Sequence, residues 1–122
     1  MSDLHHIQAF TAAMQRKDMV AMLSHMSDEI VLRTPLVAEP ASGKAAIQPI
    51  VEALLSVVDR FEFREIMQGP EHVSAFFGIT VGPHQLDGVD YWKLDDAGLI
   101  REMTVLWRPL PAVAAVNALL AG

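Results

Sequence analysis

The chain has 122 residues, of which 52% are hydrophobic and 20% charged, and it carries a formal net charge of -6 and no cysteine. This length suits one domain and the composition is too apolar for a disordered chain, so we expect residues 1–122 to form a single globular domain. The negative charge disfavours nucleic acid as a partner. The absence of cysteine excludes disulfides, thiolate nucleophiles and cysteine-based metal sites.

No stretch of the sequence approaches the roughly 20 uninterrupted apolar residues that span a bilayer, so no membrane partner is expected. Residues 1–8 have neither the basic start nor the apolar run of a secretion signal. These two observations favour a soluble, cytoplasmic protein.

Two helices and a strand are predicted in the first 34 residues. Apolar residues recur at helical spacing over residues 3–15, and Ser2 is a suitable N-cap for that helix. Asp18 is a suitable N-cap for a second, shorter helix, and we expect the pair Ser27 and Asp28 to end it. Residues 29–34 alternate in polarity and are predicted to form a strand.

A loop and a long helix are predicted next. Two prolines and a glycine mark residues 35–43 as a loop, and Ser42 can cap a helix that runs to about residue 59. Pro49 lies inside this helix, where a proline removes a backbone hydrogen bond and costs about 3 kcal/mol. We therefore expect the regular helix to begin near Gln48 or to be kinked at Pro49.

The second half of the chain is predicted to be an antiparallel meander of four strands. From Phe61 onward apolar residues recur with a period of two, and turn residues at 69–70, 82–83 and 95–98 separate the runs. Pro111 suits the first turn of a closing helix. A curved sheet packed on the long helix would bury these elements and leave a hollow, the usual setting of a small-molecule site.

Asp90 is the residue that breaks the polarity pattern. Alternation along residues 84–95 places it on the same strand face as the apolar residues Leu86, Trp92 and Leu94. Burial raises the pKa of a carboxyl group, so Asp90 is the first candidate for a proton donor or base. The alternatives are a structural role, with Asp90 bonded to a buried backbone amide or tyrosine, and a strand slip of one residue that turns it outward.

Three large side chains could line the hollow beside Asp90. Trp92, Met103 and Trp107 lie on inward strand faces, although such residues fill ordinary cores equally well. The five histidines show no metal-ligand spacing, so no metal is expected, and no catalytic triad motif is present. His25 and His72 stay open as either pocket or solvated residues.

Two segments resemble a known superfamily. Residues 34–47 read TPLVAEPASGKAAI and residues 89–100 read VDYWKLDDAGLI. With the order of elements, they resemble the SnoaL-like branch of the nuclear transport factor 2-like superfamily, which includes ketosteroid isomerases, polyketide cyclases, limonene epoxide hydrolases, scytalone dehydratases and non-catalytic members. The resemblance implies an α+β fold of the cystatin-like type. In it, a curved antiparallel sheet forms a cone-shaped barrel around a long helix, with further N-terminal helices.

The resemblance also assigns site residues. Asp90 matches the protonated acid that donates to the oxyanion in ketosteroid isomerases, and Trp92, Met103 and Trp107 match apolar pocket residues. The isomerase base falls at Thr34 and its tyrosine at Phe10, and neither side chain supplies those groups. The acid that cyclases carry on the final strand falls at Val105.

The function that the sequence predicts is therefore broad. We expect a SnoaL-like protein that binds a small apolar ligand, with Asp90 as acid or base if it is a cofactor-independent isomerase, cyclase, dehydratase or hydrolase. Thr34 would position a ligand oxygen, and Phe10, Met14, Trp92, Met103 and Trp107 would form the apolar walls. The alternative is a non-catalytic ligand-binding or interaction module. In either case we expect a homodimer and no cofactor.

Overall fold

The computed structural model describes residues 4–121. Its elements, in chain order, are α1 (His5–Arg16), α2 (Met19–Ser24), β1 (Met26–Thr34), β2 (Val37–Ser42), α3 (Lys44–Val57), β3 (Arg60–Gln68), β4 (Val73–Val81), β5 (His84–Leu94), β6 (Ile100–Arg108) and α4 (Leu110–Ala121). Ser2, the predicted cap of the first helix, lies outside the described residues. No helix within 4–121 is both long and apolar enough to cross a membrane.

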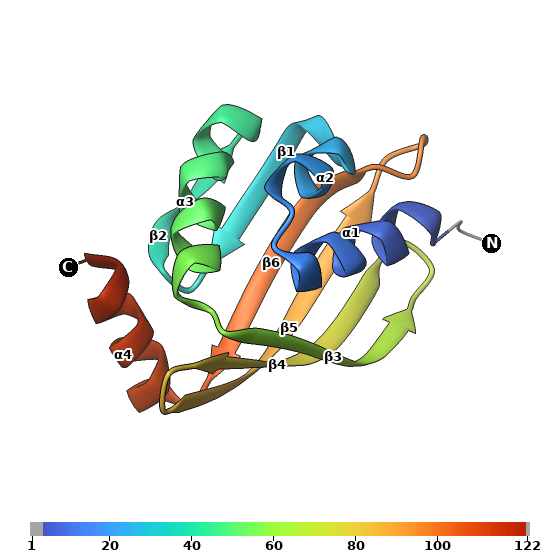
Figure 1. Ribbon diagram of the computed structural model, residues 1–122. Helices are drawn as coiled ribbons and strands as arrows, with labels where there is room; N and C mark the ends of the chain where they lie inside the picture. Colours follow the sequence, from blue (N-terminus) through green and yellow to red (C-terminus); the bar gives the residue numbers. More distant parts are fainter. Residues whose placement is uncertain (1–3, 122) are drawn as a thin grey trace.

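The six strands form one curved sheet in the order β2-β1-β6-β5-β4-β3 (Figure 1). Strands β3 to β6 pair antiparallel in sequence order, so the predicted meander is confirmed. The sheet is open rather than a closed barrel, and it is not wholly antiparallel, because β1 pairs with β6 in parallel. This pairing joins the two halves of the chain, which periodicity within one segment cannot specify.

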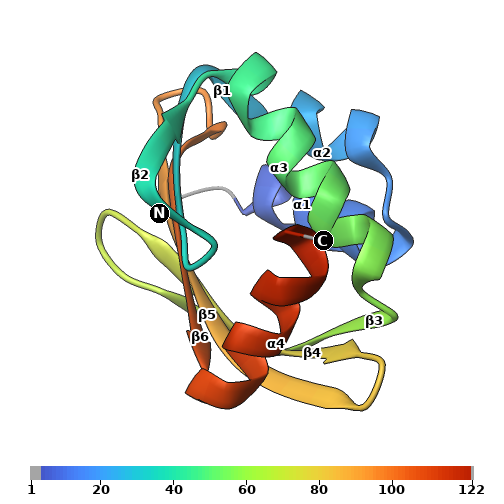
Figure 2. The ribbon, with the colours of Figure 1, turned by 90° about the vertical axis from the view of Figure 1, so that its left-hand side faces the viewer.

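The helices lie on one side of the sheet, which curves around them (Figures 1 and 2). Helix α1 turns Ile7, Phe10 and Met14 inward at the predicted helical spacing, and the Phe10 ring meets Trp92 of β5 edge-to-face at 6.1 Å. Helix α4 packs against α3 and the ends of β5 and β6. The main core therefore lies between the concave face of the sheet and the helices.

The second helix is capped as predicted but ends earlier. Asp18 accepts a hydrogen bond from the Ala21 backbone N–H at 3.1 Å, which confirms it as the N-cap. The expectation that Ser27 and Asp28 end this helix is wrong. Both lie in β1, which begins at Met26, so α2 stops at Ser24.

The predicted loop at 35–43 contains a strand. Residues Val37–Ser42 form β2, an edge strand that pairs antiparallel with β1, so Pro40 lies where a missing N–H is tolerated. The predicted cap Ser42 is wrong, because Ser42 pairs with Val31 in the sheet. The N-cap of α3 is Gly43, whose φ of 85° suits glycine, and no side chain caps the helix.

Pro49 does not delay the start of α3. The helix begins at Lys44, so the expected start near Gln48 is wrong and Pro49 sits inside the helix. A proline at this position removes the hydrogen bond to the carbonyl four residues before it. The helix nevertheless turns an apolar face towards the sheet, with Ile47 and Leu55 buried, and tertiary packing of such a face outweighs one lost bond.

Candidate functional site

An apolar cavity lies between α3 and the concave face of the sheet. Its volume open to water-sized molecules is about 50 Å³. The lining side chains come from α1, α2, α3, β1, β3, β6 and the turn after β1, and they are Phe10, Met14, Met22, Met26, Ile30, Leu32, Thr34, Leu36, Ile47, Ile50, Val51, Leu54, Leu55, Phe61, Met103, Val105 and Trp107. Because four of them are methionines, whose unbranched side chains adapt readily, the wall can widen around a ligand by rotamer changes.

The cavity brings together five of the residues that the sequence assigned to a pocket. Phe10, Met14, Thr34, Met103 and Trp107 all line it. Trp92 and Asp90 do not, although both are buried on the same sheet face, with exposed fractions of 0% and 1%. Asp90 pairs across the sheet with Val105, which lines the cavity, so its place is next to the cavity wall rather than in it.

Asp90 is buried as the alternation predicted, and the strand slip that would expose it does not occur. Burial raises the pKa of its carboxyl well above the ordinary value of 3.8, because an ionised carboxylate would lose its hydration there. Its Oδ2 has no hydrogen-bond partner within residues 4–121. Tyr91, the single tyrosine of the chain, is therefore not a partner of this oxygen, and its ring packs against that of His72 with centroids 4.6 Å apart. A buried carboxyl with a raised pKa and an oxygen without a partner among the described residues therefore lies beside the cavity.

Two indole N–H groups are also buried without a hydrogen-bond partner. The Nε1 atoms of Trp92 and Trp107 are buried and, among the described residues, have no acceptor. In the sheet register, Trp107 lies opposite Gly88, two positions before Asp90, and Trp92 lies two positions after it. Buried polar groups are normally satisfied, so three unsatisfied groups along one stretch of β5 and β6 call for an explanation in a ligand or ordered water.

Gly88 permits the close packing at this point. A Cβ at position 88 would lie 2.5 Å from Cζ of Phe77 and 2.8 Å from Cδ1 of Trp107. Both rings therefore lie directly over the backbone of β5, next to Asp90. The absence of a side chain at Gly88 fixes how far the Trp107 ring can lie over the sheet.

The kind of ligand group that this site can recognise follows from its hydrogen-bond donors. Trp107 is the cavity-lining residue with an unsatisfied N–H, and an indole N–H can only donate. Thr34, the other lining residue with a polar side chain, accepts a bond from the Leu36 backbone N–H at 3.2 Å and keeps its hydroxyl hydrogen available. A protonated Asp90 also donates. The arrangement favours an oxygen that accepts hydrogen bonds on an otherwise apolar ligand.

The sequence reasoning missed most of the wall. Met22 from α2, Met26 from β1 and Ile50 and Leu54 from α3 line the cavity but were expected only as core or not singled out. The sequence predicted that the long helix packs against the sheet. Its share in a cavity, however, depends on how far α3 stands from the sheet, and no local pattern encodes that distance.

Histidines do not contribute to the cavity. The Nδ1 atoms of His6 and His25 lie 2.9 Å apart, and burial together with the nearby His6 and His5 lowers the pKa of His25. His72 borders a separate polar hollow near Glu71 and Arg101. Within residues 4–121 no group of three or more potential ligands could hold a metal ion.

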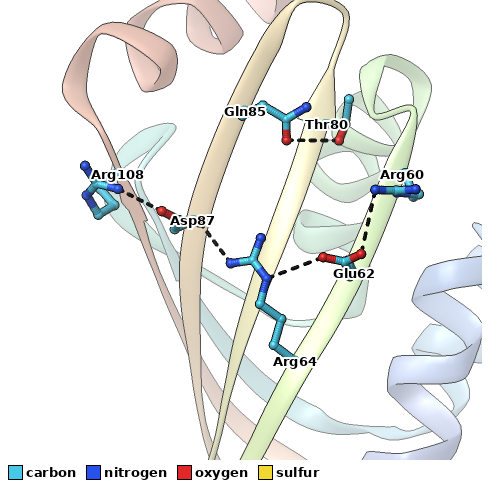
Figure 3. A network of polar contacts seen from close by, with 7 residues as sticks. All are labelled: Arg60, Glu62, Arg64, Thr80, Gln85, Asp87 and Arg108. Carbon is cyan, nitrogen blue, oxygen red and sulfur yellow. Dashed lines mark hydrogen bonds and ion pairs between the residues drawn. The ribbon is translucent and has the colours of Figure 1, made fainter.

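The opposite face of the sheet carries a charged network (Figure 3). Asp87 accepts hydrogen bonds from Arg64 at 2.9 Å and Arg108 at 2.7 Å, and these bonds lower the pKa of Asp87. Beside this network, Phe76, Val89 and Leu106 form one cross-strand row, with Phe76 38% and Leu106 60% exposed. We call this row and the adjacent network the outer face.

Comparisons with solved structures show the fold. A steroid delta-isomerase from Pseudomonas aeruginosa superposes with a TM-score of 0.87 at 22% identity, over 96% of this chain and 87% of that one. A protein with a cystatin-like fold from Silicibacter pomeroyi gives 0.83 at 21% identity, over 97% and 86%. TerC, co-crystallised with polyporic acid, gives 0.75 at 20% identity, over 98% of each chain.

Comparison with sequence families identifies the family, whereas these structural similarities show the fold. None of the curated proteins compared with the sequence matches it. The SnoaL-like domain, in contrast, matches residues 7–103, which span both N-terminal helices, the cavity-lining part of α3 and five strands with the start of the sixth. The chain therefore belongs to the SnoaL-like family.

Proposed function

We propose that this protein binds a small, mostly apolar organic molecule in the cavity between α3 and the sheet, and that Trp107 donates a hydrogen bond to an oxygen of that molecule. The observation that carries the proposal is that Trp107, whose buried Nε1 has no acceptor among the described residues, lines an otherwise apolar cavity. An N–H left without an acceptor in such a site costs free energy, and a ligand carbonyl or hydroxyl would recover it. The fold shared with a steroid delta-isomerase and with TerC supports an organic ligand.

Asp90 would act as the acid towards the bound ligand. Because burial raises the pKa of its carboxyl and so favours the protonated form, Asp90 can protonate, or donate a hydrogen bond to, an oxygen at which negative charge develops. Asp90 lies directly across the sheet from Val105, which lines the cavity, so a ligand in contact with Val105 would lie next to Asp90. Cofactor-independent isomerisation, cyclisation, dehydration and hydrolysis all use such a donor.

The test compares two ligands of the same shape and follows the indole N–H signals of the two tryptophans in the chain. Acetophenone and α-methylstyrene have the same shape, but the second carries a CH₂ group where the first has the carbonyl oxygen. In ¹H–¹⁵N spectra, acetophenone should move the Trp107 indole signal. The variant Trp107→Phe should weaken acetophenone binding about fivefold, the value of one net hydrogen bond of about 1 kcal/mol, and leave α-methylstyrene unchanged.

Two results would count against this function. Equal losses for both ligands would mean that Trp107 supplies shape and no hydrogen bond. Failure of wild type to bind either ligand at millimolar concentration would remove small aromatic ketones from the ligand class.

A second candidate function is self-association through the outer face. Phe76, Val89 and Leu106 border a shallow hollow of about 170 Å³ together with Asp87 and Arg108. A two-fold dimer would place this row against its own copy and bury the exposed Leu106 side chain. The ion pairs around the row would then form the polar rim.

Sedimentation equilibrium tests this association. Leu106→Lys should raise the dimer dissociation constant at least about tenfold, because a charge in the centre of an interface must be desolvated. Val20→Lys is the matched control, since Val20 is an exposed apolar residue, 81% accessible, on α2 rather than on the sheet. A wild-type protein that sediments as a monomer at all concentrations would refute this candidate.

A further inference from the structure

We propose that the ligand is elongated, with an apolar substituent that leaves the inner cavity and lies in a groove between α3, α4 and the turn from β1 to β2. This inference rests on the proposed function and adds the class of ligand to it. The ligand would be a compact ring or ring-like head with an oxygen next to it and an apolar chain beyond the oxygen.

The groove is a second hollow outside the inner cavity. It is lined by Leu36 from the turn, Val37 from β2, Ile50 and Ala53 from α3, and Asn117, Leu120 and Ala121 from α4. Its volume of about 220 Å³ exceeds the 50 Å³ of the inner cavity on the same measure. Figure 2 shows α3 and α4 side by side at this point. A molecule confined to the inner cavity would leave the larger hollow empty.

The two hollows are adjacent. Leu36 and Ile50 line both of them, so these two side chains form the wall between the hollows, and a change in their rotamers would join the two spaces. The parallel pairing of Arg33 with Thr104 places Thr34 and Leu36 near the end of β6 that carries Trp107. The hydrogen-bonding groups therefore lie towards this shared wall, and the methionines of α2 and early β1 lie at the far end of the cavity.

This order fixes the order of groups on the ligand. The far end of the cavity takes an apolar head, because no polar side chain lines it. The oxygen lies where Thr34 and Trp107 can donate. The groove beyond is apolar except for Asn117, so it takes an apolar chain, whose end would lie near that exposed amide.

The experiment compares acetophenone with hexanophenone, which has the same head and carbonyl and four more methylenes. A buried methylene strengthens binding roughly fourfold, so even partial burial in the groove predicts a gain of at least about tenfold for wild type. Ala53→Trp fills the groove from the exposed surface of α3. It should abolish most of the gain for hexanophenone while changing acetophenone affinity by less than about twofold.

Two further variants make the result specific. Glu52→Trp adds the same side chain at the neighbouring exposed position, which does not line the groove, and should leave both affinities unchanged. Asn117→Trp fills the groove from α4 and should reproduce the effect of Ala53→Trp, so a folding defect in one variant cannot decide the outcome.

The outcomes separate this inference from the function on which it rests. Wild type that binds neither ketone contradicts both. Wild type that binds acetophenone but gains nothing with hexanophenone, or keeps its gain in the groove-filling variants, overturns the elongated ligand alone. Equal losses for both ketones in Ala53→Trp and Asn117→Trp would also overturn it, because the groove would then not be a separate subsite.

Discussion

Replacing Asp90 with asparagine should make the stability of the protein less sensitive to pH. The pKa of Asp90 is raised in the folded state from an ordinary value of 3.8, because burial penalises the charged carboxylate. Between that ordinary value and the raised folded-state value, the folded protein holds one proton more than the unfolded chain. Stability therefore falls as pH rises through this window, and Asp90→Asn, which does not titrate, removes that loss.

The magnitude follows from the linkage of one proton. Within the window, the free energy of unfolding of wild type should fall relative to the variant by up to about 1.4 kcal/mol per pH unit. For a chain of this length that is roughly 5 °C in Tm per unit. The buried amide of asparagine adds an offset of its own, but this offset does not change with pH. The slope is thus the informative quantity.

Urea unfolding at half-unit steps from pH 4 to 8 measures this slope. Asp87→Asn is the matched control on the outer face of the same strand, where hydrogen bonds from Arg64 and Arg108 lower the pKa. Between pH 4 and 8 its difference from wild type should stay nearly constant, with wild type favoured, because the contribution of Asp87 is lost only at lower pH, as pH falls through its lowered pKa. A stability difference between Asp90→Asn and wild type that is constant with pH would refute the reasoning.

Three further substitutions test the packing and the helix start, each by urea unfolding. Gly88→Ala should destabilise by about 1–3 kcal/mol, because its Cβ must displace the rings of Phe77 and Trp107, and wild-type stability would show that the rings move freely. Asp18→Ala should cost about 1 kcal/mol by removing the cap of α2, and no change would mean that water replaces it. Ile79→Val should cost about 1 kcal/mol and leave acetophenone binding unchanged, since Ile79 is buried but does not line the cavity; weaker binding would show that its packing shapes the cavity wall.

Much of the fold was predictable because local pattern decides it. A period of two identified the strands of the meander and the inward faces of β5 and β6, and the Asp18 cap identified the start of α2. The errors cluster where pairing partners decide the structure. Residues 37–42 look like a loop on composition, but they gain hydrogen bonds from β1 at the sheet edge.

In the candidate site, too, local pattern determined some features and the tertiary structure determined the others. The sequence alone determined that Asp90 is buried, because a period of two assigns each residue of β5 to a face. The tertiary structure decided that Trp107 lines the cavity while Asp90 lies beside it, and that a second hollow against α4 adjoins the cavity. The reason is that periodicity fixes the direction of a side chain relative to its own strand. The space in front of that side chain depends on elements up to a hundred residues away.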